Sequence, residues 1–183
     1  AIKNVATFAP LINDDCPLVG IEPSAILTFR DEYLRLVENK AAANQLAKNV
    51  LTIEEFFKKE ITSGNIHPGQ FSQEEKQIKI HGHCHQKALS SVEATFAMLN
   101  VPVNTTVTIY NSGCCGMAGS FGYEKEHYEI SMQMGEDTLF PKVRATNAAV
   151  AIAAAGTSCR HQIFDGTSRK SQHPVSILKN CLK

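Results

Sequence analysis

The amino-acid sequence predicts an α/β fold, a three-layer sandwich in which helices cover both faces of a mainly parallel sheet. Two observations lead to this prediction. Short apolar or alternating runs alternate along the chain with stretches of helical periodicity, which is typical of right-handed βαβ units. In addition, cysteines follow three of the predicted strands directly. We therefore expect a cysteine site in loops at the carboxyl ends of the strands.

The first predicted strand is the apolar run 17–21, and a helix is expected to follow it with Ser24 as its N-cap. Ile26, Phe29, Tyr33 and Leu36 recur at three- and four-residue spacing, which predicts one amphipathic helix. Thr52 and Glu55 then form a capping-box pattern, so a second helix is expected to run from there to about Gly64. Residues 64–75 have the composition of a loop, where a weak domain boundary is expected.

The second half of the chain has three more strand candidates, each followed by a helix. The strands are expected at 77–81, 106–110 and 148–153. The helix after the first strand is expected to extend to Leu99, and the last helix to occupy about 159–164. The helix between them is expected at 123–139, with four side chains on one side: Tyr123, His127, Ile130 and Met134.

Composition excludes several classes of function. The 183 residues are 43% hydrophobic, which is enough for an ordinary core, and 18 basic residues balance 18 acidic ones. Without a strong net charge, nucleic-acid binding is not expected. The longest apolar stretch, 148–155, is far too short to span a membrane. The chain starts without Met or a signal-like segment, so we expect a cytoplasmic piece of a longer protein.

Six cysteines without a secretory signal indicate metal or redox chemistry in a reducing compartment rather than a disulfide framework. The four that follow predicted strands are the expected metal ligands: Cys84, Cys114, Cys115 and Cys159. Cys16 is expected to be a buried apolar side chain, and Cys181 an uninvolved surface thiol.

Thiolates bind iron–sulfur clusters or zinc, and the residue types alone fit both. The adjacent pair Cys114 and Cys115 favours a cluster, because two neighbouring sulfurs reach two iron atoms more easily than one zinc ion. Gly113 and Gly116 flank this pair and are expected to direct amide groups at the cofactor. Ligation by a nearby histidine is the weaker hypothesis, and it concerns His81, His83, His85 and His161. Zinc binding in a structural domain and thiol–disulfide catalysis remain the alternatives.

Three segments resemble the cysteine-rich CCG domain: 81–87 (HGHCHQK), 112–119 (SGCCGMAG) and 158–163 (SCRHQI). That domain occurs in the cysteine-rich component of heterodisulfide reductase and in iron–sulfur components of glycolate oxidase and anaerobic glycerol-3-phosphate dehydrogenase. It also occurs at the C-terminus of FAD-linked D-lactate or 2-hydroxyglutarate dehydrogenases, which segment 119–126 resembles most.

The resemblance implies the tail of a first repeat at 1–65 and a complete second repeat at 76–183. The chain departs from the family pattern at Ala25 and Gly156, where the family usually has cysteines. The resemblance therefore implies an ordinary [4Fe–4S] cluster on the four remaining thiolates. It also implies an electron-transfer module of a 2-hydroxy-acid oxidoreductase that is not catalytic alone. FAD would be bound by the parent protein and not by this chain. The implied partners are upstream FAD and ferredoxin-like domains and an electron acceptor, with peripheral attachment to the inner membrane face through such partners.

Overall fold

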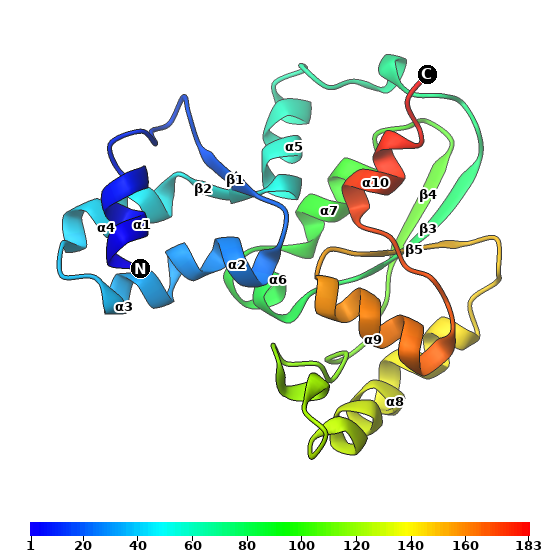
Figure 1. The fold of residues 1–183 in the computed structure, drawn as a ribbon. Coiled ribbons are helices and arrows are strands. Elements are labelled where there is room, and N and C mark those ends of the chain that lie inside the picture. Colours follow the sequence, from blue (N-terminus) through cyan, green and yellow to red (C-terminus); the bar gives the residue numbers. More distant parts are fainter.

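The computed structural model describes residues 1–183 and contains two parallel sheets. In the first part of the chain, the elements are α1 (Ile2–Phe8), β1 (Leu18–Gly20), α2 (Pro23–Ile26), the 3₁₀ turn η1 (Leu27–Arg30), α3 (Glu32–Leu36), α4 (Lys40–Lys48), β2 (Val50–Thr52) and α5 (Ile53–Thr62). Strands β1 and β2 pair in parallel, with Leu18 opposite Val50. Helices α1, α3 and α4 lie together beside this small sheet (Figure 1).

The second part contains the three-layer sandwich. Its elements are η2 (Pro68–Gln70), β3 (Lys76–His81), α6 (Cys84–Leu89), α7 (Val92–Leu99), β4 (Thr105–Ile109), η3 (Phe121–Tyr123), α8 (Tyr128–Arg144), β5 (Ala151–Ala154), α9 (Thr157–Thr167) and α10 (Pro174–Lys179). The strand order is β4-β3-β5, all parallel. Helices α7 and α10 lie on one side of the sheet, and α8 and α9 on the other (Figure 1). The predicted fold class is therefore confirmed.

Alternation along the strands separates two cores. Ile78, Ile80 and Ala153 face α7 and α10 and form one apolar cluster with Met98 and Ile177. On the other face, Ile152 and Ala154 pack with side chains of α8 and α9, chiefly Leu139, Phe140 and Ile163. Alternation also directs His81, the last residue of β3, to the α8 and α9 side, where the cysteines lie. The sheet therefore fixes which end and which face carry the site.

The capping box at Thr52 is confirmed, since Glu55 N donates to Thr52 Oγ1 and Thr52 N donates to Glu55 Oε2. Helix α5 ends at Thr62, as expected. Its residues Phe57 and Ile61 pack against the core of the second part of the chain. Helix α5 thus joins the two parts, and the repeat boundaries at 1–65 and 76–183 stay a prediction.

The predicted single helix over 24–36 is wrong. Glu22, not Ser24, caps α2, because its carboxylate accepts from Ser24 N, and the chain then passes through η1 before α3 begins. Asp31 lies between these two elements with a non-helical backbone. This break lets the guanidinium of Arg30 turn inward, where it donates to Val50 O and to the Glu55 carboxylate.

The helix predicted at 123–139 begins five residues later and continues to Arg144, because 121–123 form a 3₁₀ turn. Of the four side chains predicted on one side of this helix, Ile130 and Met134 belong to α8, and both are exposed. The buried face carries Ser131, Gly135 and Leu139 instead. A Cβ at Gly135 would lie 2.3 Å from the Phe140 ring, so the small residue permits this packing. Helices α1, α4 and α10 and strand β2 were not expected from the sequence.

Both remaining cysteines lie where the sequence did not place them. Cys16 is exposed, in a turn held by Asn13, and Cys181 is buried. Cys181 Sγ lies 3.3 Å from Lys76 Nζ, far from the other cysteines in the fold, at the amino end of β3. Burial of a cysteine depends on which elements meet there, and no local pattern records that.

Candidate metal centre

The three loops that follow β3, β4 and β5 meet at one cavity of about 430 Å³, lined by Cys84, Cys114, Cys115 and Cys159. Cys84 is the first residue of α6, and Cys159 lies in the first turn of α9. Parallel strands end at the same edge of a sheet, which explains why residues 75 positions apart converge. The four cysteines expected as metal ligands therefore share one cavity, whereas Cys16 and Cys181 lie outside it.

The cavity has a buried side and an open side. Cys115 and Cys159 are buried, and Cys115 Sγ donates to Cys159 Sγ over 3.4 Å. Cys84 is exposed and Cys114 half-buried. Cys115 Sγ thus points to the buried thiol of Cys159, whereas Cys114 lies toward the open side.

Hydrogen bonds between the thiols of this cluster lower the pKa values of the accepting thiols and raise those of the donating thiols. Hydrogen bonds from Cys115 and Cys84 lower the pKa of Cys114, and a hydrogen bond from Cys115 lowers that of Cys159. Donating these bonds raises the pKa of Cys115 and of Cys84, and burial adds to both increases. The lowered pKa values favour the thiolate form of Cys114 and Cys159, and thiolate is the form that ligates metals.

Glycine geometry shapes the loop that carries the cysteine pair. Gly116 has φ +96°, and a Cβ on it would lie 2.0 Å from the backbone oxygen of Ser131. Ser131 Oγ donates to Gly116 O, and Gln162 of α9 donates to Ser131 O, so two helices fix the loop. Gly116 N donates to Cys114 Sγ over 3.3 Å, whereas the amide of Gly113 donates to Thr138. Of these two glycines, Gly116 directs its amide at a site sulfur.

The histidines of the first loop lie in different environments. His81 is buried beside Cys115 and Cys159, and the ligand atoms of these three residues lie within 4.8 Å of one another. His83 is buried and caps α6 by accepting the amide of His85, and burial lowers its pKa. His85 lies near Glu32 on the surface side. His161 lies away from this trio, since its Nδ1 bonds to the hydroxyl of exposed Tyr123.

The first part of the chain also reaches this site, which the sequence did not reveal. Glu22 Oε2 accepts the backbone amide of Thr157 over 2.8 Å, at the N-terminus of α9, and Ser24 lines the cavity. Burial alone would raise the pKa of Glu22, but the hydrogen bonds from Thr157 and Ser24 hold it below its usual value. Glu22 therefore ties α2 to the helix that carries Cys159.

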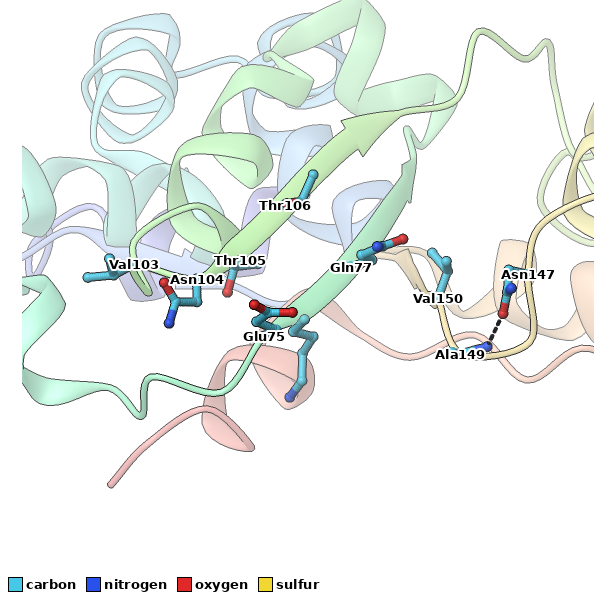
Figure 2. A pocket seen from close by; sticks show the side chains of 10 residues that line it. Glu75, Gln77, Val103, Asn104, Thr105, Thr106, Asn147, Ala149 and Val150 are labelled. Atoms are coloured by element: carbon cyan, nitrogen blue, oxygen red, sulfur yellow. Dashed lines mark hydrogen bonds between the residues drawn. The ribbon is translucent and has the colours of Figure 1, made fainter.

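A larger cavity of about 650 Å³ lies at the opposite end of the sheet, around Gln77, Thr105 and Asn147. Figure 2 shows its polar side chains spread along the strand starts, with Asn147 bonded to the amide of Ala149. No thiol or histidine lines it. The cysteine cavity is therefore the better candidate for chemistry.

The donor set of the cysteine cavity makes it a candidate thiolate-rich metal centre on an α/β sandwich, with residue types that suit an iron–sulfur cluster. No family model and no solved structure match this chain. It is 28% identical, over 97% of its length, to D-2-hydroxyglutarate dehydrogenase of Pseudomonas putida. It is 26% identical, over its full length, to one component of the anaerobic glycerol-3-phosphate dehydrogenase of Escherichia coli K12.

The D-2-hydroxyglutarate dehydrogenase of Haemophilus influenzae is 27% identical over 91% of the chain. The chain spans only 16% of the length of the two D-2-hydroxyglutarate dehydrogenases and 45% of the glycerol-3-phosphate dehydrogenase component. No helix in the structure has the length and apolar character needed to cross a membrane.

Proposed function

We propose that this chain is the electron-transfer module of a larger FAD-linked 2-hydroxy-acid oxidoreductase, and that its four site cysteines hold an iron–sulfur cluster of the [4Fe–4S] type. The observation that carries the proposal is the convergence of Cys84, Cys114, Cys115 and Cys159 on one cavity at the strand ends. Such a cluster, when bound, accepts and releases single electrons.

The names of the relatives support a role that does not depend on the substrate. One relative acts on a hydroxy acid and another on glycerol 3-phosphate, yet the similarity covers nearly the whole of this chain in both. A region shared by enzymes with different substrates is expected to serve a common step. Transfer of electrons from a flavin bound elsewhere in the parent protein to a further acceptor is such a step.

The protein groups around the site would hold the cofactor and tune its potential. Cys115 and Cys159 would anchor it at the buried side, and Cys84 and Cys114 at the open side. The amide of Gly116 would donate to Cys114 and so stabilise extra negative charge on the reduced centre. Exposure of Cys84 places one edge of the cavity near solvent, where an electron partner can approach.

A zinc-binding structural domain is the second candidate, because His81, Cys115 and Cys159 lie close enough together for one metal ion. The adjacent positions of Cys114 and Cys115 favour the cluster, because two neighbouring sulfurs reach two iron atoms more easily than one zinc ion. In the cluster model, neighbouring thiolates ligate different iron atoms; in the zinc model, one of them stays free.

Anaerobic reconstitution with iron and sulfide tests the proposal. The expected product is a brown protein whose visible absorption bleaches on reduction, with iron and acid-labile sulfide bound together. Serine in place of any one of the four site cysteines should lower bound iron sharply, while Cys16→Ser, at an exposed position, should not. A colourless product that holds a single zinc ion and no sulfide would support the structural domain instead.

A further inference from the structure

His81 carries a buried nitrogen that makes no hydrogen bond of normal geometry in the folded chain, although the ring is close enough to Cys159 to lower the pKa of that thiol. Its side chain is 1% exposed, and Nε2 makes no hydrogen bond. Leaving such a polar atom buried and unpaired costs on the order of 1–3 kcal/mol, so it calls for an explanation. Strand alternation directs this ring from the end of β3 to the cysteine side of the sheet.

The surroundings of Nε2 indicate what it is for. The two buried thiols, Cys115 and Cys159, are the neighbours with which it forms a group of ligand atoms within 4.8 Å. We propose that His81 is a direct ligand, through Nε2, of the metal bound at the buried side of the site, where Cys115 and Cys159 also lie. The proposal rests on metal binding by the proposed site. A zinc ion would take all three residues, whereas each iron of a [4Fe–4S] cluster takes one protein ligand, so His81 would there replace one of the thiolates.

The other ring nitrogen supports this assignment. His81 Nδ1 lies 3.1 Å from Ser112 Oγ. A proton on Nδ1 that is donated to Ser112 leaves the lone pair of Nε2 free for a metal. Metal-bound histidines are commonly oriented in this way by a partner on the second nitrogen. Ser112 directly precedes the cysteine loop, so the same segment that supplies Cys114 and Cys115 also orients the ring.

His83 offers the contrasting case two residues away. Its Nδ1 accepts the backbone amide of His85, so in the neutral ring the proton lies on Nε2, which is then a donor and not a ligand. The His83 ring fills the space beside Gly156, where a Cβ would lie 2.3 Å from it. Two buried histidines in one loop therefore have opposite hydrogen-bonding roles, and only His81 has a free acceptor nitrogen.

A matched pair of substitutions separates these roles. Asparagine reproduces the Nδ1 position of histidine without Nε2, so His81→Asn keeps the contact with Ser112 and His83→Asn keeps the cap of α6. The probe is Co²⁺ alone, titrated anaerobically into the metal-free full chain and followed by its thiolate charge-transfer absorption. Pulsed electron paramagnetic resonance of the reconstituted, reduced iron protein, with and without ¹⁵N-histidine, then measures nitrogen coupling to the metal.

We expect His81→Asn to weaken Co²⁺ binding and to abolish the strong histidine nitrogen coupling, while His83→Asn leaves both in place. Ser112→Ala, which removes no ligand, should weaken Co²⁺ binding by roughly 10–100-fold, and it answers the question if His81→Asn does not fold. Equal Co²⁺ affinity in wild type, His81→Asn and Ser112→Ala would overturn the proposal, as would unchanged nitrogen coupling in His81→Asn. If no cluster assembles but Co²⁺ binding depends on His81, the cluster function fails and the ligand assignment stands.

Discussion

Glu54 is a buried carboxyl group whose charge the fold compensates only in part: burial outweighs the contributions of its own amide and of Thr52 to its pKa. The side chain is 1% exposed, and neither oxygen has a hydrogen-bond partner. Burial raises its pKa from 4.5 to about 6. The nearest basic group, His173 Nε2, lies 3.9 Å away, but burial lowers the pKa of His173, so this ring adds little positive charge at neutral pH. We predict that Glu54→Gln stabilises the protein above pH 6.

The magnitude follows from the pKa. A rise from 4.5 to about 6 corresponds to about 2 kcal/mol, because each pKa unit represents about 1.4 kcal/mol. A folded-state pKa above the unfolded value means that the native state binds the extra proton. The wild-type protein therefore loses this stability as pH rises from 4.5 to 6, and the loss is complete above that range. Glutamine, which stays neutral, should gain about 1–2 kcal/mol at pH 8 and nothing at pH 4.

Thermal unfolding of the metal-free wild type and of Glu54→Gln at several pH values measures this difference. Titration of all other groups affects both proteins equally and cancels in the comparison. For a chain of this size, the gain corresponds to a rise in Tm of about 2–8 °C at pH 8. A variant that is destabilised at pH 8 but not at pH 4 would refute the reasoning, because it would show that the ionised carboxylate is held by a partner.

The neighbouring Glu55 provides the matched control with the opposite sign. Burial alone would raise its pKa, but hydrogen bonds from Arg30 and Ser90 outweigh this and hold the pKa below its usual value. Glu55→Gln should therefore destabilise the protein at pH 7, and the deficit should shrink as pH falls through the lowered pKa. Adjacent substitutions on α5 are thus expected to change stability in opposite directions.

Three further predictions concern the site. In unfolding experiments, Gly116→Ala should destabilise the chain by about 2–5 kcal/mol, because the new methyl group adds strain at a positive φ to a clash with Ser131, and it should also reduce bound iron. Gly119 is the control: it has φ +71° but open space around it, so Gly119→Ala should cost only about 1–2 kcal/mol. Glu22→Gln should weaken the attachment of α2 to α9, with a stability loss at pH 7 that shrinks as pH falls through the lowered pKa of Glu22. The chain alone should not reduce a dye with D-2-hydroxyglutarate or D-lactate, and turnover without added flavoprotein would contradict the module proposal.

Local patterns were sufficient to predict the sheet and the place of the site. Short runs of alternating or continuously apolar residues are recognisable without their neighbours in the fold, so β3, β4 and β5 were expected within a few residues. Because parallel strands end at one edge, the convergence of their loops followed from topology alone. The capping box at Thr52 likewise depends only on residues within one helical turn.

The errors have a common physical cause, which is dependence on contacts distant in sequence. Cys181 is buried because α10 returns to the start of β3, and the helix over 24–36 is broken where Arg30 reaches Val50 and Leu89. The bond between Glu22 and Thr157 joins residues 135 positions apart. None of these features leaves a periodic signal in the sequence.

His81 shows why the ligand set itself is harder to predict than the place of the site. In the sequence, three histidines at alternate positions near Cys84 look equivalent. In the fold, β3 ends at His81, so strand alternation governs His81 alone, and His83 becomes the N-cap of α6. The boundary between strand and helix falls between them and assigns their nitrogens different partners. Residue type and spacing therefore locate the candidate metal centre, whereas the hydrogen bond on the second ring nitrogen decides which histidine has a lone pair free for a metal ion.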